Sequence, residues 1–144
     1  MKVISPVFKN GEAIPEKYAS KGENIPPPLI VEEVPNNAKS LAIVLEDPKG
    51  PLKRFIHWTV WNIPADIKEI SCDKNSSYPQ GKNTMLKKGY LGPCPPFGLH
   101  HYFFKVYALD SFIQLEERAS IKKLERLISE HIVDKAELMG TYKK

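Results

Sequence analysis

Four polar side chains in this sequence are of types that recognise anions, and each lies in or beside an apolar segment. They are Asp47, His57, His100 and Tyr102. An imidazole and a phenol can each donate a hydrogen bond to an oxyanion, and a carboxylate can accept one from a neighbouring imidazole or from a protonated ligand. A few polar groups that converge in an apolar wall are typical of a small-ligand site. Whether these four converge depends on the segments that carry them.

Three segments rich in apolar, β-branched and aromatic residues are predicted to be strands, at 41–45, 55–63 and 100–109. Asp47 follows the first strand, and His57 lies in the second. His100 and Tyr102 begin the third, on the face that continues into purely apolar residues, so we expect both on its inner face. In an antiparallel sandwich these strand ends could meet and form one polar cluster.

Strict alternation along 55–63 places His57 on one face with Phe55 and Trp61, and Trp58 and Val60 on the other. Because both faces are apolar, this strand is predicted to be central in its sheet.

The remaining segments complete the prediction of a single all-β domain over residues 1–144. A polar stretch at 71–84 is predicted to be a long surface loop, and 89–98 to be a tight, ordered loop rich in glycine and proline. Ser120 is a plausible N-cap for an amphipathic helix that begins at Ile121. The last stretch, 136–143, is compatible with a short closing strand.

The composition excludes several other classes of function. The net charge of +4 comes from scattered lysines, and no nucleic-acid-binding motif is found. No signal peptide or apolar span is seen, so we expect a cytoplasmic protein without a transmembrane segment. Motifs of serine hydrolases and of nucleotide-binding loops are absent, which favours a non-enzymatic protein without a cofactor.

The same residues could instead have purely structural roles. A histidine or tyrosine in a strand usually packs in the core, and an aspartate before a proline usually forms a turn. Asp47, His57 and His100 match no local metal-ligand spacing. Cys94 is either an activated thiol or a small buried filler, and the sequence does not decide the redox state of Cys72 and Cys94.

Several motifs, in order along nearly the whole chain, resemble the phosphatidylethanolamine-binding protein family, in its short bacterial and archaeal branch of raf kinase inhibitor-like proteins. The motifs are GENIPPPL at 22–29, EDPKGP followed by His57-Trp58, GKN with GYLGPCPPFGLHHY up to Tyr102, and AELMGTY at 136–142. The resemblance implies a β-sandwich of two antiparallel sheets with a short C-terminal helix. It also implies a pocket for phosphate-type anions, such as phosphoethanolamine, formed by Asp47, His57, Pro95, His100 and Tyr102.

Three residues depart from the motifs of the family that this chain resembles: Lys49 replaces an acid, His101 replaces an arginine, and Pro26 replaces a serine. These changes affect the rim of the implied pocket and leave its centre intact. We therefore expect a binding protein for a small anionic ligand that binds or inhibits a partner, such as a kinase. The alternatives are a serine protease inhibitor that uses an exposed loop and a weak histidine-dependent hydrolase. The resemblance also implies self-association as a homodimer.

Overall fold

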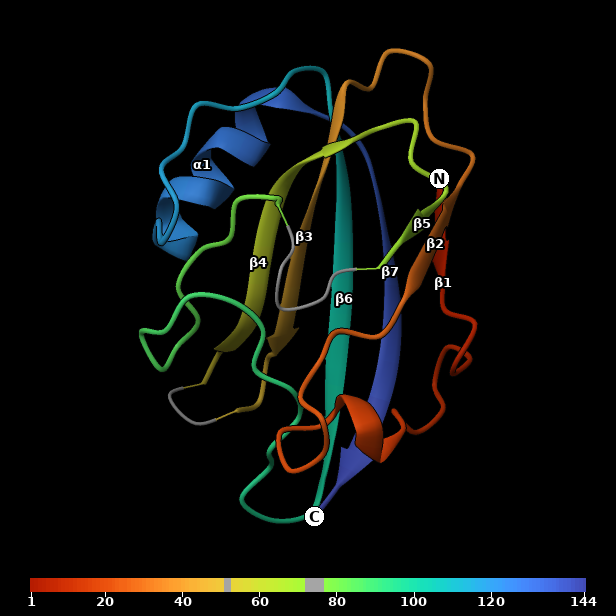
Figure 1. Ribbon diagram of the computed structural model, residues 1–144, viewed down its shortest axis with the longest axis vertical. Coiled ribbons are helices and arrows are strands. Elements are labelled where there is room, and N and C mark those ends of the chain that lie inside the picture. The colour runs from red at the N-terminus through yellow and green to blue at the C-terminus, as the bar shows by residue number, and fades with distance from the viewer. Residues whose placement is uncertain (51–52, 72–76) are drawn as a thin grey trace.

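The computed structural model describes residues 1–50, 53–71 and 77–144, and it contains two antiparallel sheets and one α-helix (Figure 1). The strands are β1 (Lys2–Ile4), β2 (Leu29–Glu32), β3 (Ser40–Asp47), β4 (Phe55–Pro64), β5 (Glu69–Ile70), β6 (Leu99–Leu109) and β7 (Ile132–Lys143). The helix α1 spans Ile121–His131, and a short 3-10 turn, η1, spans Glu16–Tyr18. The predicted all-β sandwich with a short helix near the C-terminus is confirmed.

The larger sheet has the strand order β4-β3-β6-β7, and the smaller one has the order β1-β2-β5. The main hydrophobic core lies between the two sheets, where Leu29 and Val31 of the small sheet join Leu45 and Phe104 of the large one. A second core lies between the large sheet and α1. Every residue of β3 is buried, because the small sheet covers one of its faces and α1 the other. This strand is therefore the central support of the fold.

Helix α1 begins where the sequence predicts. The Ser120 hydroxyl accepts a hydrogen bond from the backbone amide of Lys123 at 3.4 Å, which satisfies one donor of the first turn. Leu124 and Ile128 are buried against the large sheet, and the charged face is exposed. The helix thus covers the outer face over β3 and β4 (Figure 1).

The ends of three strands meet at the lower end of the molecule in Figure 1. Strand β3 is antiparallel to both of its neighbours, so its last residues pair with the first residues of β4 and with Phe103, just after the beginning of β6. Asp47 pairs with Phe55, and Glu46 pairs with Phe103. The antiparallel order therefore brings together segments that are more than 50 residues apart in the chain.

Strand β4 differs from the prediction in two respects. It forms the edge of the large sheet instead of its centre. The segment after Tyr78 covers this edge, and the backbone amide of Trp61 donates a hydrogen bond to the Pro79 carbonyl at 3.1 Å. Its side chains also do not alternate strictly, because the pairing slips at His57, between the partners Trp58 and Ile56. At such a bulge two successive residues oppose one residue of the neighbouring strand. Trp58 and Val60 face the core between the sheets and Trp61 faces α1, as alternation predicts. The slip instead turns His57 to the inner face, where its ring meets that of Tyr102, so the predicted grouping of His57 with Trp61 is wrong.

Two further segments differ from the prediction. The predicted surface loop at 71–84 includes 72–76, which lie outside the described residues, but its last part packs on β4: Asn83 is buried, and Thr84 accepts a bond from the Ile56 amide at 2.7 Å. The closing strand is much longer than expected, since β7 runs for 12 residues beside β6. Its backbone supports the whole length of β6, which carries two of the predicted site residues.

Candidate functional site

The loop at 90–98 lies at the strand ends and is anchored from one side by the segment around η1. The Tyr90 hydroxyl donates to the Tyr18 carbonyl at 2.6 Å, and the Gly92 amide donates to the Asn24 side chain at 2.8 Å. Gly92 admits no side chain, because a Cβ atom there would lie 2.3 Å from the Tyr18 carbonyl oxygen. The loop is therefore held close to the strands, as its glycine and proline content predicts.

His57 is buried and is oriented by this loop. Its Nδ1 atom lies 2.7 Å from the Leu91 carbonyl oxygen, and the Leu91 amide in turn donates to the His57 carbonyl at 2.9 Å. Burial lowers the pKa of His57, although the bond to Leu91 and the charge of Asp47 act in the opposite direction. The imidazole is consequently neutral at pH 7, and its Nδ1 carries the proton that the carbonyl accepts.

Asp47 and His100 form a pair at the ends of β3 and β6. The Nδ1 atom of His100 lies 2.5 Å from Oδ2 of Asp47, and the backbone amide of Lys49 donates to Oδ1 at 2.9 Å. Asp47 is buried, whereas His100 is partly exposed. The carboxylate therefore fixes the orientation of an imidazole that solvent can reach.

Tyr102 lies on the inner face of β6, two residues after His100. Its ring meets the ring of His57 edge-on, with centroids 5.2 Å apart. Burial and the negative charge of Asp47 raise the pKa of Tyr102, although a backbone hydrogen bond with Cys94 opposes them. The hydroxyl therefore stays protonated at neutral pH and can serve as a donor.

These groups surround a small cavity of about 30 Å³, which is lined by Asp47, Phe55, His57, Cys94, Pro95, Pro96 and Tyr102. Four of the five predicted residues line it, and the fifth, His100, is bonded to one of them. The sequence reasoning did not assign Phe55, Cys94 and Pro96 to the site. The sequence contains a signal for Phe55, because residues two apart in a strand lie on the same face and Phe55 precedes His57 by two. In the structure the centroids of the two rings are 4.6 Å apart.

Cys94 fits neither of its predicted roles. Its side chain is exposed and free, so it is not a buried filler. Partial desolvation of the thiol and the charge of Asp47 raise the pKa of Cys94, which is the opposite of activation. Cys72 lies outside the described residues.

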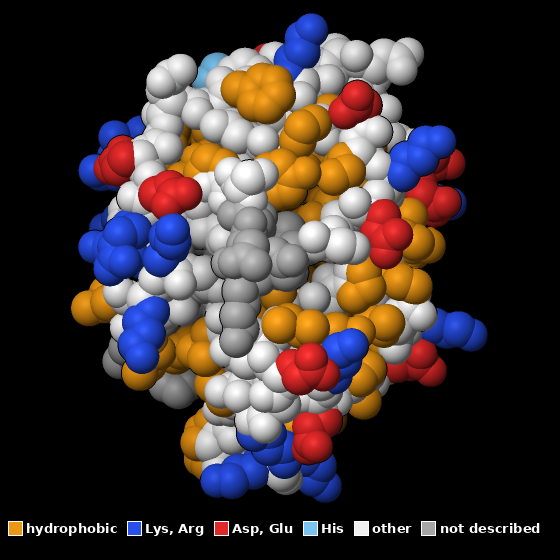
Figure 2. All heavy atoms as spheres, viewed as in Figure 1, with side chains coloured by type: hydrophobic (Ala, Val, Ile, Leu, Met, Phe, Trp, Pro, Cys, Tyr) orange, Lys and Arg blue, Asp and Glu red, His pale blue; other side chains and the backbone are white. Residues whose placement is uncertain are grey.

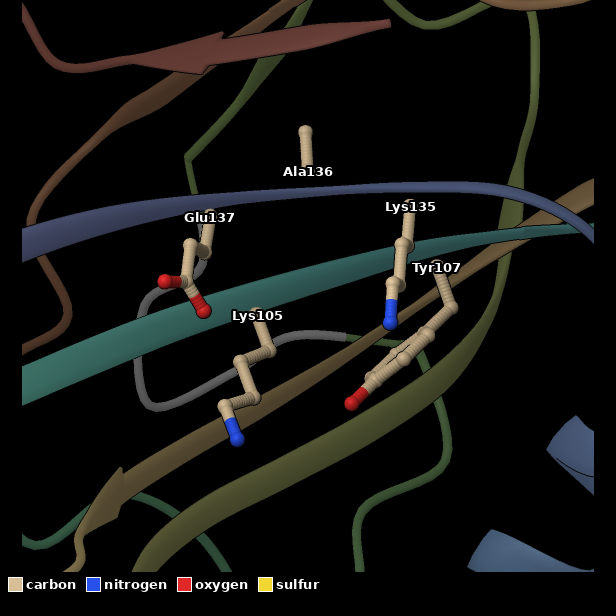
Figure 3. A pocket seen from close by; sticks show the side chains of 5 residues that line it. All are labelled: Lys105, Tyr107, Lys135, Ala136 and Glu137. Carbon is tan, nitrogen blue, oxygen red and sulfur yellow. The ribbon is translucent and has the colours of Figure 1, made fainter.

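A larger cavity, of about 320 Å³, lies on the outer face of β6 and β7. Figure 3 shows Lys105, Tyr107, Lys135 and Glu137 on one side of these strands and Ala136 on the other. None of these side chains is fully buried, and Lys105 is already paired with Glu46 at 3.3 Å. The strand-end cavity is the better candidate site, because buried polar groups line it.

Within the described residues, no three or more His, Cys, Asp or Glu side chains are grouped so that they would hold a metal ion. Among the same residues, no helix is long and apolar enough to cross a membrane.

The fold and this site define a protein class. The family model of the phosphatidylethanolamine-binding proteins matches residues 4–143, and the chain belongs to that family. A UPF0098 protein of Pyrococcus horikoshii is 44% identical, over 98% of this chain and 76% of its own length. A UPF0098 protein of Chlamydia pneumoniae is 41% identical, over 100% of this chain and 99% of its own length.

Two solved structures share the fold closely. The crystal structure of a phosphatidylethanolamine-binding protein homologue from Chlamydia trachomatis superposes with a TM-score of 0.94 at 38% identity, covering 99% of this chain and 97% of its own. That of Escherichia coli YbcL, described as a member of the mammalian family, superposes with a TM-score of 0.90 at 29% identity, covering 99% and 98%. Membership of this family thus supports a binding protein.

Proposed function

We propose that this protein binds a phosphate-type anionic group in the strand-end cavity, without chemical conversion, and that it acts by binding or inhibiting a partner protein. The observation that carries the proposal is the convergence of His57, His100 and Tyr102 beside a cavity closed by Pro95. His57 and Tyr102 are potential donors in the lining, and the His100 ring is bonded to Asp47 of the same lining; such a set is suited to the oxygens of an anion.

The electrostatics of the site favour recognition of a protonated or partly neutralised anion. Asp47 is a negative charge in the lining, so the site depends on its histidines for compensation. Because Nδ1 of His57 is committed to Leu91, the other ring nitrogen serves the ligand. It accepts a bond from a ligand hydroxyl while the ring is neutral, and it donates once the ring is protonated. Figure 2 shows Lys and Arg side chains with Asp and Glu side chains among them at the lower end of the molecule. The net charge of +4 adds a weak attraction for anions.

The size of the cavity limits what enters it. A water molecule occupies about 30 Å³ in the liquid, and the cavity has a volume of about 30 Å³. It therefore accepts one or two oxygens of a ligand, and the rest of the ligand stays outside.

Calorimetric titration with inorganic phosphate and phosphoethanolamine tests the proposal. We expect binding by the unchanged protein, and a loss of about tenfold or more in His57→Gln and His100→Gln. His101→Gln is the matched control, because His101 follows His100 directly but is exposed and does not line the cavity. Equal binding by all four proteins would refute the site. Release of inorganic phosphate from phosphoethanolamine that disappears in both site variants would instead favour a hydrolase.

One observation favours a second candidate function, the inhibition of a serine protease. Phe97 is 77% exposed and stands in a loop stiffened by Pro95 and Pro96. A rigid loop that presents a large apolar side chain is suited to the specificity pocket of a chymotrypsin-like protease.

Protease assays with excess protein test this second candidate. Inhibition of a chymotrypsin-like protease should be lost in Phe97→Ala and retained in Phe112→Ala. Phe112 is a suitable control because it is 54% exposed but lies after β6 and outside this loop. Unchanged protease rates with the unmodified protein would eliminate the candidate.

A further inference from the structure

A larger groove adjoins the strand-end cavity. It has a volume of about 420 Å³ and is lined by Asn24, Phe55, Asn83, Met85, Lys87, Lys88, Tyr90, Leu91 and Cys94. Phe55 and Cys94 line both spaces, so the two lie side by side. Ligand sites in proteins typically measure about 300–1,000 Å³, and the groove falls in this range while the strand-end cavity does not.

The outer wall of the groove is a loop with a fixed shape. The Asn83 side chain is buried, and its Oδ1 atom accepts bonds from the backbone amides of Met85 at 2.9 Å and Lys87 at 3.3 Å. The Thr84 amide donates to the Ile56 carbonyl at 2.9 Å, which fastens the loop to β4. Met85 is nevertheless 60% exposed. A thioether held in the open on a rigid loop provides apolar surface without an internal partner.

The charges at the groove favour an anionic ligand. Lys87 and Lys88 both line it; Lys88 is paired with Glu117 at 2.7 Å, while no described residue forms an ion pair with Lys87. No acidic side chain is among the lining residues.

A third cavity, of about 220 Å³, also touches the site and is lined by Ser20, Lys21, Pro93, Cys94, Pro95, Tyr142 and Lys144. It is the weaker candidate for the body of a ligand. It is smaller, and its Lys21 already contacts Glu16 at 3.3 Å and lies over the ring of Tyr142.

We propose that the ligand is a phosphate monoester with an apolar, preferably aromatic, body; this proposal rests on the anion site proposed above. The phosphate oxygens enter the strand-end cavity, and the body lies in the groove between Phe55 and Met85. Such a ligand gains affinity from the apolar surface that it buries, which inorganic phosphate and phosphoethanolamine cannot do.

Calorimetry with 1-naphthyl phosphate and inorganic phosphate tests this assignment. We expect the naphthyl ester to bind at least about tenfold more tightly than phosphate. The advantage should disappear in Met85→Asp and persist in Leu86→Asp. The two variants change the net charge equally at adjacent exposed positions, but only Met85 lines the groove. Inorganic phosphate should bind both variants alike.

Methionine methyl NMR signals provide a readout in the unmodified protein. The chain has three methionines, Met1, Met85 and Met139. The naphthyl ring should shift the Met85 methyl signal through its ring current, whereas phosphate should not, and the signals of Met1 and Met139 should stay in place.

The outcomes separate the two proposals. Phosphate binding without an advantage for the naphthyl ester, or an advantage that survives in Met85→Asp, overturns the groove assignment alone. An unmoved Met85 signal at saturation with the ester does the same. Absence of binding by both compounds overturns the anion site and the groove together.

Discussion

Two neighbouring carboxylates at the end of β3 face opposite sides of the large sheet and have different surroundings. Glu46 is 4% exposed and receives two bonds from the Arg54 guanidinium, at 2.8 and 2.9 Å, with Lys105 at 3.3 Å. Burial would raise the pKa of Glu46, but the bonds and charges of Arg54 and Lys105 outweigh it and lower the pKa. Arg54 also binds Glu125 of α1, at 2.8 and 2.9 Å.

Asp47 is equally buried, at 3% exposure, but its partners are a backbone amide and the His100 ring. No Lys or Arg side chain described in the structure forms an ion pair with it. A carboxylate that is fully paired with fixed cations holds a fold together, as Glu46 joins β3 to α1. A carboxylate bonded to a titratable ring beside a cavity leaves that ring to respond to a ligand. We therefore regard Glu46 as structural and Asp47 as part of the site.

The largest effect should come from Arg54→Ala. The substitution leaves Glu46 buried without its bidentate partner and removes the ion pair with Glu125 of α1, so we expect a loss of about 2–3 kcal/mol in the free energy of unfolding. Phosphate affinity of the folded protein should stay unchanged. Urea denaturation measures the loss, and Arg126→Ala, an exposed position on α1, should change stability by less than about 0.5 kcal/mol. An equal loss in both variants would contradict the assigned role.

Tyr102→Phe should lower phosphate affinity, which Arg54→Ala leaves unchanged. It removes one donor from the cavity and keeps the buried ring, so phosphate affinity should fall by about tenfold, which corresponds to about 1.4 kcal/mol. Tyr107→Phe is the control, because Tyr107 lies on the outer face of the same strand. Calorimetry compares the two, and equal affinities would remove the hydroxyl of Tyr102 from the site.

The site around His57 and the ion-pair cluster around Glu46 should lose stability in different ranges of pH. Because the folded-state pKa of His57 is lowered from 6.5, the unfolded chain binds more protons, and stability should decline as pH falls below about 6.5. Because the pKa of Glu46 is lowered from 4.5, its stabilising contribution is present above that value and is lost as pH falls further.

Denaturation at a series of pH values checks both windows. His57→Gln should remove the first decline, and Glu46→Gln should remove the second. Saturating phosphate should reduce the first decline, because an anion stabilises the protonated ring of His57. Persistence of the first decline in His57→Gln would assign it to another group.

The smallest effect should come from Glu125→Gln. This position is about 40% exposed, so its pair with Arg54 is screened by water, and we expect a loss of about 0.5 kcal/mol. Glu130→Gln on the same helix, which forms no ion pair with a described residue, should be neutral. A loss above about 2 kcal/mol in Glu125→Gln would mean that the helix contact, rather than Glu46, dominates the cluster.

The sequence alone predicts three of the strands, the start of the helix and the types of the site residues, but not β1, β2 or β5. Strands β3, β4 and β6 and the start of α1 are local properties, because apolar runs, proline stops and an N-cap act over a few residues. The inner-face position of Tyr102 follows from simple alternation along β6.

The orientation of these residues and their surroundings depend on contacts between segments that are separate in the chain. The bulge at His57 turns this side chain toward Tyr102 and away from the face of Trp61, and it depends on the register of pairing with β3, a separate strand. The bond between His57 and Leu91 joins a side chain to a backbone carbonyl 34 residues away, and backbone atoms carry no sequence signal. Likewise, Glu46 and Asp47 are two adjacent acids in the sequence, and their different roles arise because α1 covers one face of β3 and the cavity opens on the other.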